Sequence, residues 1–239
     1  MKTLDFLATA MTAFMLAIGS TGAQASASPA APDAIIAIDV LIQPDQAMVA
    51  KANAVNAVLR SNYPGGYSLD ATHAPHVTLL QRFVRTRDLD AVESAVKKVI
   101  DAERPAGLQL KATGLVYAMS AGVAVTLIAV ERTSELAELQ QKVADAIAPF
   151  AVSGGTSAAF IDTAPGADIV QYVETFVPKH SGANYFPHIT AGVATEAFVK
   201  DLKAQPFDAV SFNPAGVAIY QLGNFGTASK KLKEWELKR

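Results

Sequence analysis

The sequence predicts an α+β fold of two similar lobes, related by a pseudo-two-fold axis, with a central cleft between them. Stretches rich in β-branched residues alternate with stretches whose apolar residues are three and four positions apart, so strands and amphipathic helices alternate. The tetrapeptide PHVT at residues 75–78 recurs as PHIT at residues 187–190. After each copy the pattern indicates one helix and then two strands. We therefore expect each lobe to be a small antiparallel sheet with helices outside.

The strands are predicted from runs of β-branched and aromatic residues between turn-forming residues. The first run, 35–42, is almost continuously apolar and is typical of a buried strand. The two copies of the tetrapeptide lie on the second and fifth strands. Residues 231–237 form either a last strand or a short helix. The other expected strands occupy residues 69–83, 108–117, 123–130, 188–193, 207–212 and 216–222.

The helices are predicted from single apolar stripes and from their start and stop signals. Pro44 and Asp45 begin the first helix, which runs to Leu59, and Thr133 precedes the third. We expect Pro178 to end the fourth and Pro206 to follow the last. Residues 152–165 are expected to be a loop with at most a short strand, and 179–186 a polar loop. The remaining helices are expected over residues 89–103, 135–147, 167–177 and 195–204.

Composition limits the classes of partner. The 239 residues are 51% hydrophobic and 18% charged, which suits a globular protein with a substantial core. The formal net charge is −2 and the pI is about 6.1, so no overall positive field exists to hold a long nucleic acid. A small phosphorylated ligand needs only a local pocket, and it remains compatible with this balance.

The N-terminus predicts a signal peptide over residues 1–25. Lys2 is followed by a mostly apolar run over 6–18 and by two A-x-A cleavage patterns. The run is shorter than the ~20 residues needed to cross a bilayer. We expect a short leader over 26–34 and one bilobal domain over 35–239. The mature chain is then expected to be a monomer in a bacterial periplasm or secreted, with no membrane attachment.

Cysteine is absent from the sequence, which excludes disulfides, a thiol nucleophile and a thiolate zinc site. No GxxxxGK loop, no GxGxxG fingerprint in a strand–helix context and no GxSxG elbow occurs either, so nucleoside triphosphate, dinucleotide and serine hydrolase chemistry lack support. No cofactor is expected.

The repeated tetrapeptide predicts the chemistry. Side chains two apart on a strand share a face, so His76 projects with Thr78, and His188 with Thr190. An imidazole titrates near pH ~6.5, so one can accept a proton while the other donates one. Displacement at a phosphodiester needs a base and an acid on opposite sides of phosphorus, and two hydroxyls can bind its non-bridging oxygens. We predict His76 and His188 as the catalytic pair and Thr78 and Thr190 as phosphate-binding residues.

The other two histidines and two aromatic residues are further candidates for a metal or substrate site. His73 and His76 are three apart, but Pro75 argues against a helix there, and in a strand they would face opposite sides, so no metal site is expected. We expect His180 to be a solvated loop residue. Tyr185 and Phe186 directly precede the second motif; they either stack on a base at the mouth of the cleft or pack locally.

At these residues the sequence resembles the 2H phosphoesterase superfamily, which includes bacterial 2'-5' RNA ligase-like proteins and RNA 2',3'-cyclic phosphodiesterases. Its hallmark is a pair of H-x-[ST]-hydrophobic motifs, present here as HVTL at 76–79 and HITA at 188–191. The prolines before both histidines and the closing segment GNFG at 223–226 are also similar to that group. The resemblance covers residues 35–237.

The resemblance implies a bilobal fold and metal-independent chemistry on 2',3'-cyclic or 2'-5'-linked phosphodiesters. His76 and His188 would be the acid–base pair, with Thr78 and Thr190 on the phosphate. The expected substrate is a small nucleotide or a short RNA end. Two alternatives stay open: a non-catalytic nucleotide- or phosphate-binding module of the same fold, and 2'-5' RNA ligase-type activity, which an exported location disfavours.

Overall fold

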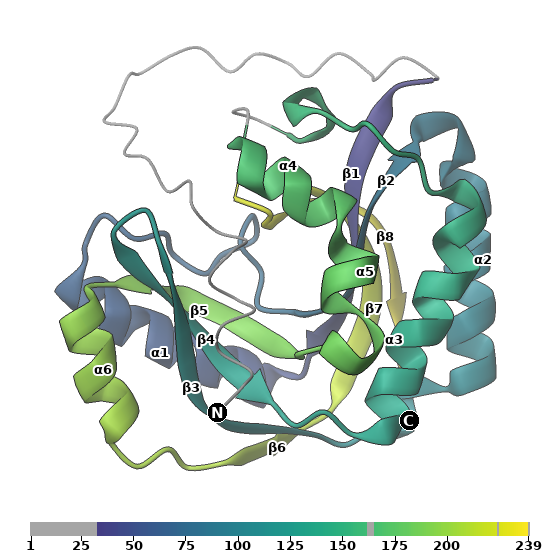
Figure 1. The fold of residues 1–239 in the computed structure, drawn as a ribbon. Helices are drawn as coiled ribbons and strands as arrows, with labels where there is room; N and C mark the ends of the chain where they lie inside the picture. Colours follow the sequence, from purple (N-terminus) through teal and green to yellow (C-terminus); the bar gives the residue numbers. More distant parts are fainter. Residues whose placement is uncertain (1–32, 162–164, 224, 239) are drawn as a thin grey trace.

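The computed structural model describes residues 33–161, 165–223 and 225–238, and within them the strands form two four-stranded antiparallel sheets (Figure 1). The first sheet has the order β2-β1-β7-β8 and the second the order β5-β4-β3-β6. The strands are β1 Ile35–Pro44, β2 Val77–Arg85, β3 Leu110–Ser120, β4 Val123–Val130, β5 His188–Ala194, β6 Val210–Phe212, β7 Pro214–Leu222 and β8 Ala228–Glu236. The helices are α1 Gln46–Asn62, α2 Leu89–Glu103, α3 Ser134–Ile147, α4 Ala167–Glu174, α5 Phe176–His180 and α6 Glu196–Ala204.

The α+β, two-lobe architecture is therefore confirmed. The signal peptide predicted over 1–25 and most of the leader predicted over 26–34 lie outside the described residues. Within the described ranges, no helix is long and apolar enough to cross a membrane.

The two sheets share one layout. In each, the strand that carries the tetrapeptide lies at an edge, beside the strand that comes before it in the chain: β2 pairs with β1, and β5 pairs with β4. The two edge strands also contact each other, which joins the lobes. The pseudo-two-fold relationship thus places both copies of the motif at the boundary between the lobes.

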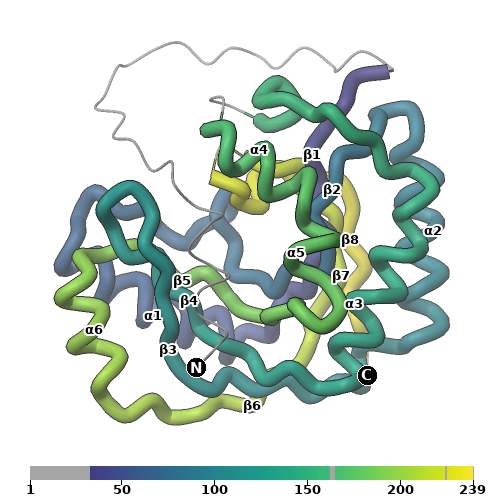
Figure 2. Tube along the Cα trace, in the orientation of Figure 1, coloured from purple at the N-terminus to yellow at the C-terminus, as the bar shows by residue number. Residues whose placement is uncertain are grey.

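The lobes are not consecutive halves of the chain. After β2 and α2 the chain crosses into the other sheet as β3, and after β5, α6 and β6 it returns as β7, a path that Figure 2 lets the reader follow. The helices cross over as well: α1 follows β1 but packs on β5, and α3 follows β4 but packs on β2. Figure 1 shows α2 and α3 on one side of the molecule and α1 and α6 on the other.

Local signals explain the main helix starts. Asp45 caps α1 by accepting a hydrogen bond from the Met48 amide at 3.0 Å, and Thr133 caps α3 through the Leu136 amide at 3.2 Å. The apolar stripes of α2 and α3 pack together, and their buried residues join the main core with those of β1 and β2. Burial of these stripes contributes to the stability of the lobe at roughly 25 cal/mol per Å² of apolar surface.

Some local expectations were wrong. The second strand begins at Val77 rather than at residue 69, because residues 69–76 form a loop. Pro178 does not end a helix: α4 stops at Glu174, and Pro178 lies in the first turn of α5, where its missing N–H has no intrahelical partner to lose. His180 consequently belongs to α5 instead of a solvated loop. Of the two alternatives for residues 231–237, the strand is the correct one, since most of them lie within β8.

Candidate active site

A β-bulge follows the threonine in both copies of the motif. Along β1 and β2, Val40 pairs with Leu80 and Leu41 with Thr78, which leaves Leu79 as the extra residue. Along β4 and β5, Thr126 pairs with Gly192 and Leu127 with Thr190, which leaves Ala191. Bulges bend a strand and re-aim its side chains, and they are frequent beside active sites. The fourth position of each motif is therefore the point at which the strand turns, and the histidine and threonine lie just before it.

Two buried amide side chains hold these bulges from the helices. Nδ2 of Asn56, on α1, donates to the carbonyl of Ala191 at 2.8 Å. Nε2 of Gln140, on α3, donates to the carbonyl of Leu79 at 3.2 Å. Each amide oxygen also accepts from a backbone N–H in the loop before the motif, Leu69 at 3.3 Å and Gly182 at 3.2 Å. These contacts satisfy backbone groups that the bulges remove from the ladder.

Both motif histidines are fixed by a contact with their own chain. Nδ1 of His76 lies 2.7 Å from the carbonyl oxygen of Ala74, and Nδ1 of His188 lies 2.8 Å from that of Phe186, each two residues back. A carbonyl oxygen can only accept, so Nδ1 carries the hydrogen in both rings. Nε2 is then the nitrogen left to exchange a proton: it accepts one in the neutral ring and donates one in the imidazolium.

Burial sets the protonation of these rings. It lowers the pKa of His76 below its usual value, and the hydrogen bond to Ala74 offsets part of that shift. Burial likewise lowers the pKa of His188, the hydrogen bond to Phe186 opposes this, and the charge of His76 lowers it further. A proton on His76 therefore makes protonation of His188 less favourable.

Asp39, on β1, is a buried carboxyl beside the site that the residue pattern did not indicate. Its Oδ2 accepts hydrogen bonds from Thr78 Oγ1 and Gln81 Nε2, both at 2.9 Å, and lies 3.6 Å from His76 Nε2. Burial raises its pKa to about 7, although the two hydrogen bonds pull it down. The signal was an acidic residue inside a run of buried apolar residues, a place where carboxyls are rare.

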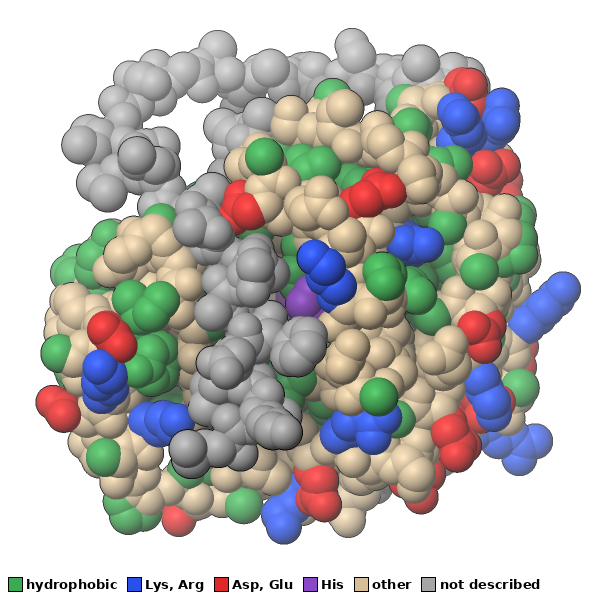
Figure 3. Space-filling view, viewed as in Figure 1, with side chains coloured by type: hydrophobic (Ala, Val, Ile, Leu, Met, Phe, Trp, Pro, Cys, Tyr) green, Lys and Arg blue, Asp and Glu red, His purple; other side chains and the backbone are tan. Residues whose placement is uncertain are grey.

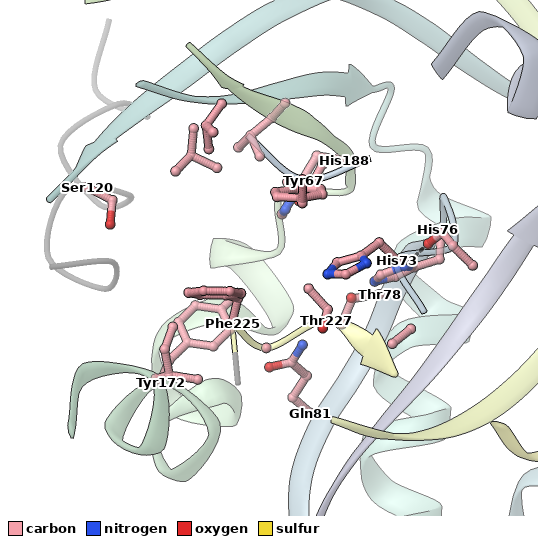
Figure 4. Close-up of a pocket in the computed structure, with 18 of the residues that line it drawn as sticks. Tyr67, His73, His76, Thr78, Gln81, Ser120, Tyr172, His188, Phe225 and Thr227 are labelled. Carbon is pink, nitrogen blue, oxygen red and sulfur yellow. Dashed lines mark hydrogen bonds between the residues drawn. The ribbon is translucent and has the colours of Figure 1, made fainter. Parts of the chain in front are cut away.

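The two motifs open onto one cavity of about 120 Å³. His76, Thr78, His188 and Thr190 all line it, so the structure brings these four predicted site residues together. In the close-up of Figure 4, His76 and Thr78 lie on one side, and Tyr172 and Phe225 lie on the other. Figure 3 shows a histidine side chain near the middle of the face between the lobes. The other lining residues are Tyr67, Leu69, His73, Ala74, Gln81, Ser120, Val125, Leu127, Asp168, Ile169, Val193, Gly226, Thr227 and Ala228.

The remaining predicted residues have different surroundings. Tyr185 is 4% exposed, and its hydroxyl donates to the carbonyl of Thr78 at 2.9 Å, so the local-packing alternative describes it and its ring is not placed to stack on a base. Phe186 stacks on His188 with ring centroids 5.7 Å apart, outside the cavity lining, and its predicted contact with substrate stays a prediction.

The other two histidines of the sequence, His73 and His180, both pack against aromatic rings. His73 lines the cavity and stacks on Tyr67 with ring centroids 5.1 Å apart. His180 packs against Tyr172, and burial, with the charge of Lys179, lowers its pKa to about 4. Within residues 33–161, 165–223 and 225–238, no three His, Asp or Glu side chains are grouped as metal ligands.

The chain is similar to known proteins to different degrees. The family model of the 2'-5' RNA ligase superfamily matches residues 46–215, more than half of the chain. TT0787 of Thermus thermophilus has a similar crystal structure, with a TM-score of 0.51 at 15% identity over 84% of this chain and 98% of that one. E. coli LigT complexed with 3'-AMP also matches, with a TM-score of 0.39 at 13% identity over 86% of this chain and 100% of that one. No curated protein matches the chain.

Proposed function

Because the chain belongs to the 2'-5' RNA ligase superfamily, we propose that it is a metal-independent phosphodiesterase that acts on 2',3'-cyclic or 2'-5'-linked phosphodiesters of small nucleotides or RNA ends. One observation carries the proposal: His76 and His188 have the same Nδ1 contact and line one cavity together with Thr78 and Thr190. This arrangement supplies two proton-transfer groups and two hydroxyls around one phosphate.

The geometry supports a simple hydrolytic step. The neutral imidazole takes a proton from the attacking water as oxygen bonds to phosphorus, and the imidazolium gives its proton to the ribose oxygen that leaves. The Thr190 hydroxyl donates to a non-bridging oxygen, whose negative charge grows in the transition state, and the Thr78 hydroxyl does so when its hydrogen turns from Asp39 to the phosphate. Water is added and no other reactant is consumed. Either histidine can be the base, since both present Nε2.

The experiment is an assay of the purified chain, with EDTA present, against 2',3'-cyclic nucleotides and 2'-5'-linked dinucleotides. We expect turnover in EDTA, and a fall in kcat of about 100-fold or more for His76→Ala and for His188→Ala, since each removes one proton-transfer group. Thermal unfolding of each variant shows that it is folded. Unchanged turnover in the double variant would overturn the proposal.

The same assay separates the alternatives. A non-catalytic binding module would bind 3'-nucleotides in calorimetry and turn over no diester. An RNA ligase-type activity would join 2',3'-cyclic and 5'-hydroxyl ends of RNA fragments, and a parallel reaction with such fragments measures it. The net charge of −2 does not support a long nucleic acid as the partner, because binding one needs a basic surface.

We also propose that the chain is exported to the periplasm or the medium and acts there as a monomer. The support is the N-terminal sequence: Lys2, the apolar run and the A-x-A patterns before residue 28. N-terminal sequencing of the protein recovered from a bacterial periplasm tests cleavage near residue 25. Size-exclusion chromatography with light scattering tests the monomer.

A further inference from the structure

One wall of the cavity carries a carboxylate. Asp168 lines the cavity from the first turn of α4, and one helical turn later Tyr172 lines it as well. Residues four apart share a helix face, so both side chains belong to the same wall. Figure 4 places Tyr172 and Phe225 on the side opposite His76 and Thr78.

Asp168 has an oxygen with an unused acceptor site. Its Oδ2 is buried, and it accepts no hydrogen bond from any described residue. An aspartate in a first helical turn ordinarily stabilises the helix by facing the free amides there. Oδ2 does not accept from those amides, so stabilisation of α4 leaves it unexplained. A buried acceptor without a donor is destabilising, and a donor on a bound ligand would relieve that cost.

The rest of the wall suits a flat, uncharged group. Tyr172 and Phe225 supply aromatic rings, and Ile169 supplies apolar surface. Among the described residues that line the cavity, Asp168 is the one with a formal charge at neutral pH, apart from the histidines. A second phosphate placed here would meet a carboxylate at short range, whereas an N–H donor would meet an acceptor.

We propose that Asp168 determines specificity, by accepting a hydrogen bond from an amino group on the nucleobase of the substrate while the scissile phosphate lies between the histidines. The inference rests on the proposed function of the same cavity. The substrate class it names is a nucleoside cyclic phosphate whose base carries an exocyclic amino group and whose only negative charge is the reacting diester.

Two matched pairs of substrates test the inference. The 2',3'-cyclic phosphates of adenosine and purine riboside differ by the 6-amino group alone, and those of guanosine and inosine by the 2-amino group alone. A site that hydrogen-bonds an N–H discriminates against the analogue that lacks it. We expect kcat/KM to fall by about tenfold or more on loss of the amino group in at least one pair, since a bond to a charged acceptor contributes about 1.5–3 kcal/mol.

The variant Asp168→Asn should reduce that discrimination to about twofold or less, because the amide offers a weaker, uncharged acceptor. Asp201→Asn, on the exposed surface of α6, makes the same change in charge away from the cavity and should keep the wild-type ratio. Thermal unfolding of both variants shows whether each is folded. An Asp168→Asn protein with wild-type ratios would overturn the inference.

The outcomes for the two proposals are distinguishable. If the wild type hydrolyses all four cyclic phosphates and treats each pair alike within about twofold, the role of Asp168 fails and the phosphodiesterase stands. If no cyclic phosphate is hydrolysed, calorimetric dissociation constants for the same four compounds replace the rates, and the ratio within each pair tests Asp168 directly. Absence of both turnover and discrimination overturns both proposals.

Discussion

Asn56 and Gln140 make equivalent contacts in the two halves of the molecule. Asn56 donates to the bulged carbonyl of Ala191 at 2.8 Å, and Gln140 to that of Leu79 at 3.2 Å. Each amide comes from a helix that follows a strand of the opposite sheet. A helix that follows a strand of one sheet therefore holds the bulged motif strand of the other sheet, and this contact positions the histidine and threonine of that strand.

Replacement of either amide should weaken both the fold and the site. In Asn56→Leu or Gln140→Leu, a buried bulged carbonyl and a half-buried loop N–H lose their partners, so we expect a loss of about 2–3 kcal/mol in the free energy of unfolding. The motif strand is then held less firmly, and kcat/KM should fall by about tenfold.

Urea unfolding and the cyclic phosphodiesterase assay measure the two effects. Gln141→Leu is the matched control, because Gln141 is exposed and its amide donates to Asp145 at the surface, so stability should change by about 0.5 kcal/mol or less. Equal stability of Gln140→Leu and Gln141→Leu would contradict the role of the buried amide.

The two motif threonines should respond differently to substitution by valine. Thr78 donates its hydroxyl hydrogen to Asp39 at 2.9 Å, whereas the Thr190 hydroxyl has no hydrogen-bond partner among the described residues. Thr78→Val leaves the buried carboxyl with one donor fewer and should cost about 1–3 kcal/mol of stability. Thr190→Val should leave stability nearly unchanged.

Both valine variants should lose activity, because each removes a hydroxyl from the phosphate. A decrease in kcat of about tenfold or more is expected for each. Chemical denaturation with the activity assay separates the two readouts. If Thr190→Val lowers the free energy of unfolding as much as Thr78→Val does, the bond from Thr78 to Asp39 does not stabilise the fold as predicted.

Asp39 should make stability depend on pH. Burial raises its pKa from 3.8 to about 7, so between these values the folded protein binds a proton that the unfolded chain has released. The free energy of unfolding from this group therefore falls as pH rises from about 4 to 7, by about 4 kcal/mol if the whole shift is expressed. Asp39→Asn removes this loss, so its stability relative to the wild type should increase with pH.

Urea titrations at pH 5, 6, 7 and 8 measure that difference. The lowered pKa values of His76 and His188 act in the opposite direction: each histidine binds a proton more readily when unfolded, so stability rises with pH up to about 6.5. Both proteins contain these histidines, so a comparison at each pH isolates the carboxyl, apart from its contact with His76. If the free energies of unfolding of the wild type and of Asp39→Asn change with pH in parallel, Asp39 is ionised in the folded protein over this whole range.

The catalytic rate should peak on the acid side of the ordinary histidine pKa. Catalysis needs one protonated and one neutral imidazole, and burial lowers the pKa of both rings. As pH rises above these values the acid loses its proton and the rate falls; below them the base is protonated. We expect a bell-shaped profile of kcat/KM with its maximum below about pH 6.5.

Initial rates from pH 4 to 9 on one cyclic phosphate provide the measurement. The charge of His76 contributes to the shift of His188, so His76→Ala should raise the apparent pKa that controls the remaining activity. A rate that continues to increase above pH 8 would assign the proton transfers to other groups.

Much of the local structure was readable from residue patterns. Thr133 is the N-cap of α3, as its position before an apolar stripe indicated. The first helix was expected to begin with Pro44 and Asp45, but Pro44 ends β1 and Asp45 is the N-cap of α1. Val77 and Ile189 are fully buried beside half-buried threonines, as the alternation of a strand requires. The repeated tetrapeptide therefore identified the residues that line one cavity before any contact was known.

The sequence by itself determined the elements, the repeat and the four side chains that face the cleft, because periodicity of two or 3.6 residues is a property of the local chain. The tertiary structure decided what those side chains meet. In the folded protein, α1 and α3 each pack on the sheet opposite to the strand they follow, and the motif strands bulge at Leu79 and Ala191. Asp39 lies beside Thr78, and Tyr185 is buried. Each of these depends on which distant segment pairs with which, and local patterns specify a buried face without specifying its partner.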